Sequence, residues 1–251
     1  MKGGVGKSVT TASLAFGLAR EGKKVLALDA DAQHSLTVSL GVRKPEALPV
    51  TLATVISNII SDVSFNPCEG IIKHQEGIDL MPANLNLVGA ELSLVQAIGR
   101  ETVLRRYIEM TQADYDYVVI DTSPSLGLLT LNSLAAADRV IIPVAPKYLD
   151  AKGMELLLKT IAQIKRQINP RLEISGILFT MVDKRANFTK ETIGEIENAY
   201  GGKIHIFSEY IPRSVRAAET GAAGVSIYAY DPRGKVAAAY EALVKEVLRC
   251  A

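Results

Sequence analysis

The sequence predicts an α/β protein with a doubly wound, mainly parallel sheet and helices on both faces. Short apolar runs alternate with helix-period segments along the 251 residues, and most of these runs are continuously apolar. Continuous apolar runs are typical of parallel strands that are covered on both faces. A glycine-rich loop also stands in front of the first helical segment. In such folds the functional loops lie at the carboxyl ends of the strands.

The first element is the loop Lys2-Gly3-Gly4-Val5-Gly6-Lys7-Ser8, and a helix is expected over Val9–Glu21. The glycines let the backbone curl so that its N–H groups point at an anion. Lys7 supplies a positive charge for the β- and γ-phosphates of a nucleotide, and the Ser8 hydroxyl is a ligand for Mg²⁺. The positive end of the helix faces the same phosphates. The loop therefore predicts a phosphate-binding site.

This loop departs from the usual P-loop pattern. That pattern has a glycine five residues before Gly6, where this chain has Met1, and a second lysine, Lys2, stands at the front of the loop. A phosphate loop joins a strand to a helix, so a strand of about five to six residues should precede it. Such a strand is usually interior, and its loss leaves neighbouring strands with unpaired edges. We therefore expect a missing first strand, supplied by a reading frame that extends upstream with an apolar run.

The next expected strand, Val25–Asp29, is followed closely by a second carboxylate, Asp31. If the strand continues through both aspartates, their side chains lie on the same side. One carboxylate can help to hold the Mg²⁺ shell, and the other can orient or deprotonate an attacking water. The alternative is a solvated strand end with ordinary acidic residues. The preceding phosphate loop favours the functional interpretation.

A third feature is the strand Tyr117–Asp121, in which four apolar residues precede an aspartate. This is the Walker B pattern, and it places Asp121 at the Mg²⁺ shell. The pattern is weak by itself, because many buried strands end in aspartate. It gains weight here because it follows a phosphate loop and another acidic strand.

The remaining strands and helices are predicted from the same continuous apolar runs and helix-period segments. Residues 41–77 are the least regular part, with Pro45, Pro49 and Pro67, and are expected to form a surface excursion. Further strands are expected at Ile78–Pro82, Arg139–Val144, Ile174–Val182 and Ile204–Phe207. Further helices are expected at Leu85–Ile98, Glu101–Ala113, Leu126–Ala137, Gly153–Ile168, Thr189–Tyr200 and Lys235–Leu248. No linker interrupts them, so we expect a single domain over residues 1–251.

Net charge, cysteine content and the length of apolar runs limit the partners and the chemistry that this protein can have. The 28 basic and 27 acidic residues nearly cancel, so any contact with nucleic acid must come from a local patch. Cys68 and Cys250 are far apart and form no CxxC pair, which disfavours a metal or redox site and fits a reducing cytosol. There is no signal peptide, and no apolar run approaches the length of a membrane span.

The two-lysine loop, the Asp29-Ala30-Asp31-Ala32-Gln33 segment and the Asp121 strand together resemble the ParA/MinD family of P-loop ATPases, whose phosphate loop is of the deviant Walker A type. The resemblance continues through residues 179–185 and 210–216 and ends in Tyr230-Asp231-Pro232. It therefore covers nearly the whole chain. The later segments are similar to the chromosome- and plasmid-partition members, the Soj/ParA type.

The resemblance implies roles for individual residues. The implied catalytic residues are Lys2, which in the family reaches across a dimer interface to the partner's nucleotide, Lys7 and Asp31. The implied nucleotide-binding residues are Lys2, Gly3, Gly4, Val5, Gly6, Lys7, Ser8, Val9, Met181, Pro212 and Ser214. The implied metal ligands are Ser8, Asp29 and Asp121, and the implied DNA-contacting residues are Arg185, Arg213, Arg216 and Lys235.

The function implied by the resemblance is that of a slow, partner-stimulated ATPase. With ATP and Mg²⁺ it would form a sandwich homodimer, bind DNA without sequence preference, and segregate plasmid or chromosomal DNA with a ParB-like partner. It would act in the cytoplasm, at the nucleoid. Val9, Ala32, His34 and Ser214 stand where the family usually has other residues. None of them replaces Lys2, Lys7 or Asp31, so we expect ATP binding to be kept and the hydrolysis rate to be the property affected.

Two alternatives stay open. A MinD-like ATPase would bind a membrane through a C-terminal amphipathic helix, but the apolar stripe of Lys235–Ala251 is more typical of a core face and lacks a basic, aromatic cluster. A nucleotide-switched regulator of replication or transcription would bind ATP with little turnover. The basic residues near the C-terminus are mixed with acidic ones, and composition alone favours an ordinary solvated surface there.

Overall fold

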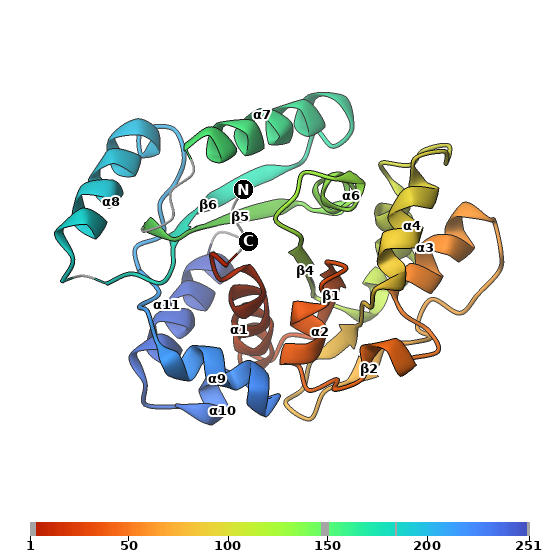
Figure 1. The fold of residues 1–251 in the computed structure, drawn as a ribbon, viewed down its shortest axis with the longest axis horizontal. Coiled ribbons are helices and arrows are strands. Elements are labelled where there is room, and N and C mark those ends of the chain that lie inside the picture. The colour runs from red at the N-terminus through yellow and green to blue at the C-terminus, as the bar shows by residue number, and fades with distance from the viewer. Residues whose placement is uncertain (1–3, 147–150, 184, 250–251) are drawn as a thin grey trace.

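The computed structural model describes residues 4–146, 151–183 and 185–249, and it has helices on both faces of a central layer of strands (Figure 1). The strands are β1 (Val25–Ala30), β2 (Ile72–Lys73), β3 (Asp79–Met81), β4 (Tyr117–Thr122), β5 (Arg139–Val144) and β6 (Glu173–Phe179). The helices are α1 (Lys7–Arg20), α2 (Ser35–Ser39), α3 (Leu52–Ile60), α4 (Asn86–Leu94), α5 (Val103–Thr111), α6 (Leu128–Ala136), α7 (Ala151–Gln167), α8 (Asn187–Tyr200), α9 (Val215–Ala223), α10 (Ile227–Tyr230) and α11 (Lys235–Arg249). Single 3₁₀ turns, η1 (Pro45–Ala47) and η2 (Gln112–Asp114), complete the assignment.

The strands pair mainly in parallel, as the sequence predicts. One sheet has the order β2-β3-β1-β4 and a second has the order β5-β6. β1 pairs in parallel with β3 and β4, β5 pairs in parallel with β6, and the short β2 is antiparallel to β3. Every residue of β1 is buried, which explains why its sequence is continuously apolar up to Asp29.

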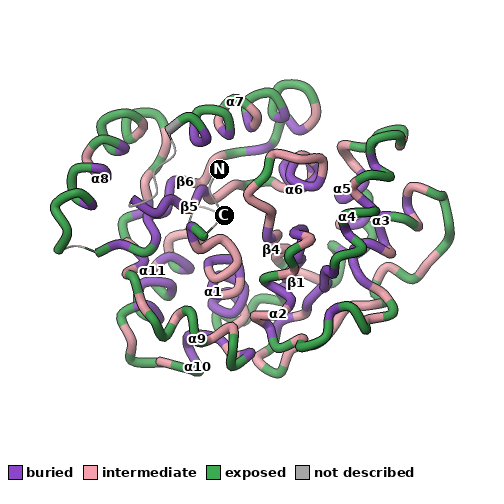
Figure 2. The backbone as a smooth tube through the Cα atoms, viewed as in Figure 1, coloured by how far each residue is buried: buried purple, intermediate pink, exposed green. Residues whose placement is uncertain are grey.

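Alternate residues of β1 face two different cores. Val25 and Ala27 pack with α1 and α11, whereas Leu26 and Leu28 pack with α3, α4 and α5. A third core joins β5 and β6 to the inner faces of α7 and α8. The buried segments therefore gather around the strands, while the outer faces of the helices are exposed (Figure 2). This arrangement confirms the doubly wound α/β class.

The sheet is interrupted between β4 and β5. Each of these strands stands at an edge of its own sheet, and a cavity of about 740 Å³ lies between them. Val118, Val119 and Ile120 of β4 are apolar yet only partly buried, unlike the residues of β1. Among the described residues, the facing edges of β4 and β5 pair with no other strand.

The C-terminal helix packs tightly against α1. A Cβ added to Gly17 of α1 would lie 2.4 Å from Val244 Cγ2 and 2.6 Å from Tyr228 Oη. Tyr228 donates a hydrogen bond to the Ser13 carbonyl at 3.1 Å, and the hydroxyl groups of Thr10 and Tyr240 are 3.1 Å apart. The apolar stripe of α11 is therefore a core face, as expected from its composition. Among the described residues, no helix is both long and apolar enough to span a membrane.

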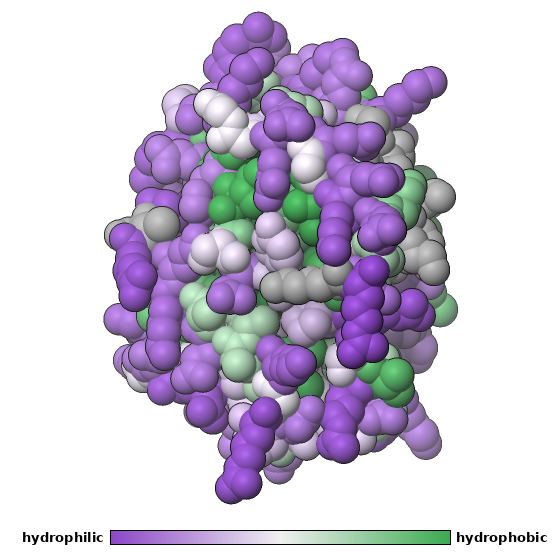
Figure 3. Space-filling model, turned by 90° about the vertical axis from the view of Figure 1, so that its left-hand side faces the viewer, coloured by the Kyte–Doolittle hydropathy of each residue, from purple (hydrophilic) through white to green (hydrophobic). Residues whose placement is uncertain are grey.

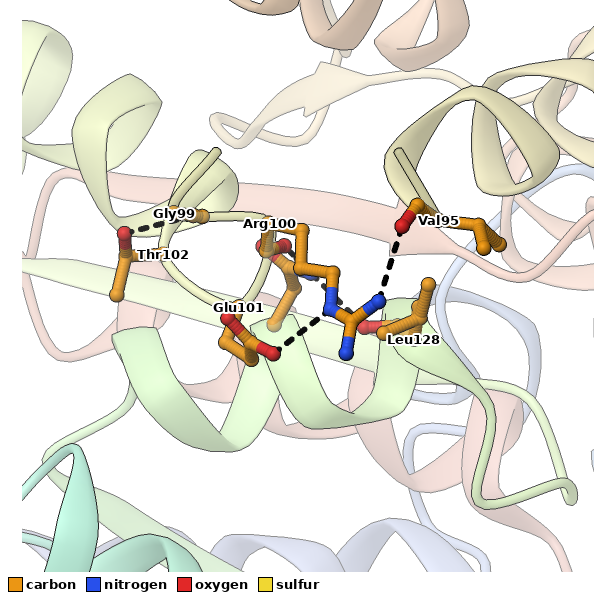
Figure 4. Close-up of polar contacts among 7 residues, drawn as sticks. Val95, Gly99, Arg100, Glu101, Thr102 and Leu128 are labelled. Atoms are coloured by element: carbon orange, nitrogen blue, oxygen red, sulfur yellow. Dashed lines mark hydrogen bonds and ion pairs between the residues drawn. The ribbon is translucent and has the colours of Figure 1, made fainter. Parts of the chain in front are cut away.

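Polar contacts fasten α6 to the connection between α4 and α5 (Figure 4). The Asn132 side-chain amide donates to the carbonyls of Arg100 and Leu128, and Arg100 Nη1 donates to the Val95 carbonyl at 2.9 Å. Glu91 of α4 also accepts a hydrogen bond from the Leu129 N–H, near the start of α6. These contacts hold the amino end of α6 in place just after the loop that follows Asp121.

Two expectations about elements are wrong. Residues 41–77 are not only a surface excursion, because they contain α3, whose Leu52, Val55 and Ile56 are buried. The prolines flank this helix instead of interrupting it, and a capping box at Thr51 starts it. The strand expected over Ile204–Phe207 is reduced to an isolated bridge between Ile177 and Ile206. The short helices α9 and α10 were not expected from the sequence pattern.

Candidate functional site

The loop before α1 has the backbone conformation that its glycines allow. Gly4 has φ 80° and Gly6 has φ 82°, in the left-handed region that side chains disfavour. Gly6 is the N-cap of α1, and its carbonyl accepts the first helical hydrogen bond, from Thr10 N–H at 2.9 Å. The chain therefore curls directly into the positive end of a helix, which is a geometry suited to an anion.

The loop is fixed to the end of β6. Thr180 Oγ1 donates to the buried Val5 carbonyl at 2.8 Å, and Met181 Cε lies 3.8 Å from the position of a Cβ on Gly6. Met181 is one of the few non-glycine residues with a positive φ, 52°. Val182 forms an isolated bridge with Pro212, and Arg213 N–H donates to the Val182 carbonyl at 3.2 Å. Residues 180–182 and 211–213 thus form one wall beside the loop.

Asp121 lies at the carboxyl end of β4 and is 1 % exposed. Its Oδ1 accepts hydrogen bonds from Thr11 Oγ1 at 3.4 Å and from Thr122 N–H at 3.1 Å. Its Oδ2 is the one buried side-chain oxygen or nitrogen among the described residues that has no hydrogen-bond partner. Burial and, to a smaller extent, the nearby Asp29 charge raise the pKa of Asp121 to about 7, although a hydrogen bond from Ser8 opposes the change. A cation beside Oδ2 would satisfy this carboxylate.

Asp29 is the register partner of Asp121 on β1, and both oxygens of its carboxylate accept hydrogen bonds within the protein. Oδ2 accepts hydrogen bonds from Thr37 N–H at 2.8 Å and from Thr37 Oγ1 at 2.7 Å, and Oδ1 accepts from Asp31 N–H at 3.2 Å. Thr37 Oγ1 in turn accepts from Ala83 N–H at 3.0 Å. Burial raises the pKa of Asp29 to about 6 despite these bonds. Asp29 therefore fastens α2 and the turn that carries Asp31.

That turn has a left-handed residue in it. His34 N–H donates to the Asp31 carbonyl at 2.8 Å, and His34 has φ 44°. A residue with a side chain seldom adopts this left-handed conformation. Asp31 itself is 9 % exposed, and its Oδ1 accepts a hydrogen bond from Gln33 N–H at 3.0 Å.

Lys7 joins the loop to both aspartates. Burial lowers the pKa of the Lys7 ammonium, and the negative charges of Asp121 and Asp31 partly oppose that effect. The structure therefore brings Lys7, Ser8, Asp31 and Asp121 together at the carboxyl ends of β1 and β4. Val9 lies in the first turn of α1 and packs toward the core. Lys2 and Gly3 lie outside the described residues.

Sequence reasoning missed three hydroxyl residues that position this site. Thr11 binds Asp121, Thr37 binds Asp29, and Thr180 binds the loop. Thr11 lies one helical turn after Lys7, so its spacing was a usable signal. Nothing in the local sequence identified Thr37 or Thr180, because their partners are distant along the chain.

The donor set fits a hard divalent cation. Among the described residues, no group of three or more histidine, cysteine, aspartate or glutamate side chains could hold a metal ion. In ATPase sites Mg²⁺ is bound by one or two protein oxygens together with phosphates and water, so it needs no such group. The unpartnered Oδ2 of Asp121 and the Ser8 hydroxyl beside it suit this kind of site.

The basic residues predicted to contact DNA are exposed and lie on the side of α8, α9 and α11. Arg213 and Arg216 flank the start of α9, Lys235 begins α11, and Arg185 precedes α8. Arg216 lies 3.8 Å from Asp231, so its charge is partly offset. Figure 3 shows this face of the molecule, which is largely hydrophilic with apolar patches between the polar side chains.

Comparisons with known proteins identify the family of this chain. A family model described as an AAA domain matches residues 1–174. The sporulation initiation inhibitor protein Soj of Bacillus subtilis is 39% identical over 250 residues, covering 98% of this chain and 94% of Soj. The chromosome partitioning protein ParA of Myxococcus xanthus is 36% identical, covering 99% of this chain and 85% of ParA.

A solved structure is similar over the same length. It is the cobyrinic acid a,c-diamide synthase of Mycobacterium smegmatis with bound ADP and magnesium, which has a TM-score of 0.85 and 35% identity and covers 99% of this chain and 91% of its own. These relatives each cover 98% or 99% of this chain. The chain therefore belongs to the ParA/MinD family of P-loop ATPases and is of the Soj type.

Proposed function

We propose that this protein is a DNA-partition ATPase, which binds Mg·ATP at the loop before α1 and hydrolyses it slowly. The observation that carries this proposal is the meeting of Lys7, Asp31 and Asp121 beside a loop at a helix N-terminus. The Soj-type relatives support the partition role. The mycobacterial relative, which was crystallised with an ATP analog and magnesium, supports the choice of nucleotide and ion.

Different residues are assigned to phosphate binding, adenine contact, metal binding and activation of water. The N–H groups of residues 4–8 and the Lys7 ammonium bind the phosphates, and Met181, Pro212 and Ser214 contact the adenine end. Ser8 and Asp121 would hold Mg²⁺, which neutralises phosphate charge when it is bound. Asp29 contributes to the metal site by positioning, since its oxygens are already used by Thr37 and Asp31. Asp31 orients the attacking water and accepts its proton.

The second lysine explains why such an ATPase would pair. In the proposal Lys2 neutralises phosphate on the nucleotide of a second protomer, so that ATP joins two chains in a sandwich dimer. The paired chains then present Arg185, Arg213, Arg216 and Lys235 from both protomers to one DNA backbone. Contacts of this kind are to phosphates, so they are independent of sequence and weaken with salt. A ParB-like partner bound to a centromere site stimulates hydrolysis and releases the DNA at the nucleoid.

The test combines DNA retention with nucleotide state. The protein is applied to immobilised mixed-sequence DNA with ATP or with ADP, and its mass in solution is measured in parallel. We expect dimers and retention with ATP only. The Lys2→Ala variant should bind ATP and lose both, whereas Lys23→Ala, in the connection between α1 and β1, should keep both. Equal retention with ATP and ADP would contradict the proposal that ATP controls DNA binding. ATP-dependent dimerisation of the Lys2→Ala variant would contradict the proposed role of Lys2 across the interface.

Turnover separates the enzyme from a nucleotide-switched regulator. Phosphate release is measured in a single turnover, with and without DNA. The Asp31→Ala variant should bind ATP normally and release phosphate about 10²- to 10⁴-fold more slowly, which is the usual contribution of a general base. A wild-type chain that releases no phosphate under either condition would favour the regulator.

A further inference from the structure

Helix α6 begins without a capping side chain of its own. Its N-cap is Gly127, and its first turn contains no acidic residue. The first four N–H groups of a helix have no partner inside the helix, and they carry the positive end of its dipole. A carboxylate from another part of the chain can therefore stabilise this end of α6.

Glu91 of α4 supplies that carboxylate. α4 lies beside α6 (Figure 1), and Glu91 Oε1 accepts a hydrogen bond at 3.3 Å from the N–H of Leu129, the second residue of α6. Glu91 is the only charged residue in the sequence from Leu85 to Gly99, and it is partly buried. A charge that loses part of its hydration on folding needs a polar partner, and here the partner is the start of α6.

The residue at the N-cap of α6 fits this carboxylate. A Cβ added to Gly127 would overlap Glu91 Oε1, whereas its distance to Ser125 Oγ, 3.5 Å, is an ordinary contact. Gly127 has φ −74° and ψ −178°, which a residue with a side chain adopts readily. The backbone conformation therefore does not require glycine at this position, but the close approach of Glu91 does.

The start of α6 is joined to Asp121 by the segment 122–127. Thr130 Oγ1, in the first turn of α6, donates a hydrogen bond to the Ser125 carbonyl at 2.7 Å, and the hydroxyl groups of Ser123 and Ser125 are 2.8 Å apart. The first N–H of the segment donates to Asp121 Oδ1 at 3.1 Å. A series of short contacts thus leads from the start of α6 to the carboxylate that would hold Mg²⁺.

We propose that Glu91 is a positioning residue for ATP hydrolysis, which holds the start of α6 and thereby fixes the segment 122–127 and Asp121. This role rests on the proposed function, because it concerns the hydrolysis step assigned there. Hydrolysis requires phosphate, water and metal ligands in a fixed arrangement, so movement of the segment slows it. Binding of ATP depends mainly on the loop before α1 and is affected much less.

The experiment compares Glu91→Ala and Glu91→Gln with wild type. Glutamine keeps an acceptor oxygen for the Leu129 N–H, and alanine does not. Glu109→Ala, which removes an exposed carboxylate from α5, is the control. For each chain we measure ATP affinity by calorimetry, phosphate release in a single turnover, and amide hydrogen exchange without nucleotide or magnesium. Thermal unfolding establishes that each variant is folded at the temperature used.

We expect Glu91→Ala to release phosphate about tenfold more slowly, with its ATP affinity within about twofold of wild type, since a helix cap is lost and the phosphate loop is unchanged. Amide exchange at Thr122, Leu129 and Leu131 should be about tenfold faster in this variant. Glu91→Gln should release phosphate within about threefold of the wild-type rate, and Glu109→Ala should match wild type in every measurement.

Two results for Glu91→Ala would overturn the positioning role. One is wild-type phosphate release together with wild-type amide exchange. The other is a loss of ATP affinity as large as the loss of rate, which would show a general structural effect. If the wild-type chain itself released no phosphate, the proposed hydrolysis would be contradicted instead, and the amide exchange would still decide whether Glu91 holds the segment 122–127.

The Gly127→Ala variant gives an independent test of the same contact. Its methyl group would displace the Glu91 carboxylate from the start of α6, so phosphate release should slow about as much as in Glu91→Ala. In the double variant the methyl group meets no carboxylate, and the rate should equal that of Glu91→Ala alone. Losses that multiply in the double variant would show that the two residues act separately, and would contradict the proposed contact.

Discussion

At the scale of single residues, Asp29 and Asp121 show how neighbouring carboxylates come to differ. They are register partners on β1 and β4, and both are buried. Asp29 accepts bonds on both oxygens, whereas Oδ2 of Asp121 has no partner. The sequence predicted both as metal ligands, because it showed that each ends a strand. It could not show that Thr37, eight residues further along the chain, donates two hydrogen bonds to Asp29.

The unpartnered carboxylate should be visible in stability at different pH values. The pKa of Asp121 is about 7 in the folded protein and near 3.8 when unfolded. Between these values the folded state keeps a proton that the unfolded state has lost, so the free energy of unfolding falls as pH rises. The Asp121→Asn variant has no proton to lose at this position. As the pH rises from 4 to 7, its free energy of unfolding should therefore increase relative to that of wild type, by at most about 1.4 kcal/mol per pH unit.

The measurement is denaturant unfolding from pH 4 to pH 8 without nucleotide or magnesium. The comparison is between variant and wild type at each pH, so that the titration of acids far from Asp121 cancels. Asp114→Asn, an exposed change in η2, is the control and should follow wild type. Parallel curves for Asp121→Asn and wild type would contradict the prediction.

Lys7 should dominate nucleotide affinity. Its ammonium lies among carboxylates at the helix N-terminus, and its loss removes a hydrogen bond to a charged group worth about 1.5–3 kcal/mol. We expect Lys7→Ala to weaken ATP binding about tenfold to 150-fold, measured by calorimetry, with the fold and thermal stability retained. Lys23→Ala removes an exposed lysine from the connection between α1 and β1 and should bind ATP as wild type does. Wild-type affinity in Lys7→Ala would exclude the loop as the binding site.

At the scale of elements, long periodic segments were predicted well and short ones were not. The structure confirms strands β1, β4 and β5, and helices α5, α6, α7, α8 and α11 within a few residues. The helix α3 was not predicted, because its nine residues give little periodicity and prolines lie on both sides of it. The helix α9 was not predicted, because none of its residues is buried and its sequence therefore has no apolar stripe.

The close contact of α1 and α11 gives a test at this scale. A methyl group on Gly17 would overlap Val244 and Tyr228, and overpacking of this kind usually costs about 1–3 kcal/mol. Gly17→Ala should therefore lower the free energy of unfolding by about that amount, measured in urea. Gly194→Ala is the matched control, since nothing lies within 4 Å of that helical position and alanine should stabilise α8 by about 0.5–1 kcal/mol. A stabilised Gly17→Ala variant would show that α11 can move away.

At the scale of the whole molecule, the sequence predicted the parallel sheet, its faces and the edge that carries the site. It located Lys7, Asp31 and Asp121 because each stands next to a strand or helix end, where a parallel sheet brings such ends together. It could not predict how residues 180–182 and 211–213 join, since that depends on an isolated bridge between distant segments. The family resemblance supplied Met181, Pro212 and Ser214 instead.

The proposed DNA surface predicts a salt dependence that belongs to the assembled molecule. Each phosphate contact contributes about 0.9 to the slope of log affinity against log salt. The Arg213→Ala change should lower this slope by about one contact per protomer in the presence of ATP. Arg216→Ala should lower it less, because Asp231 already offsets that charge at 3.8 Å.

Retention on mixed-sequence DNA at several salt concentrations measures the slope. Arg106→Ala, an exposed arginine on α5 over the opposite core, is the control and should leave the slope unchanged. If all three variants keep the wild-type slope, the DNA surface lies elsewhere.

The hydrogen bond from Thr180 to Val5 is the first of several contacts that connect the phosphate loop to Arg213. Gly6 lies against Met181, Val182 is bridged to Pro212, and Arg213 is bonded back to Val182. The phosphate pocket and the first basic residue are thus only a few peptide units apart along one short ladder. In the proposed function, a small shift of the main chain along this span would carry a change at the nucleotide to the DNA-contacting side chain of Arg213.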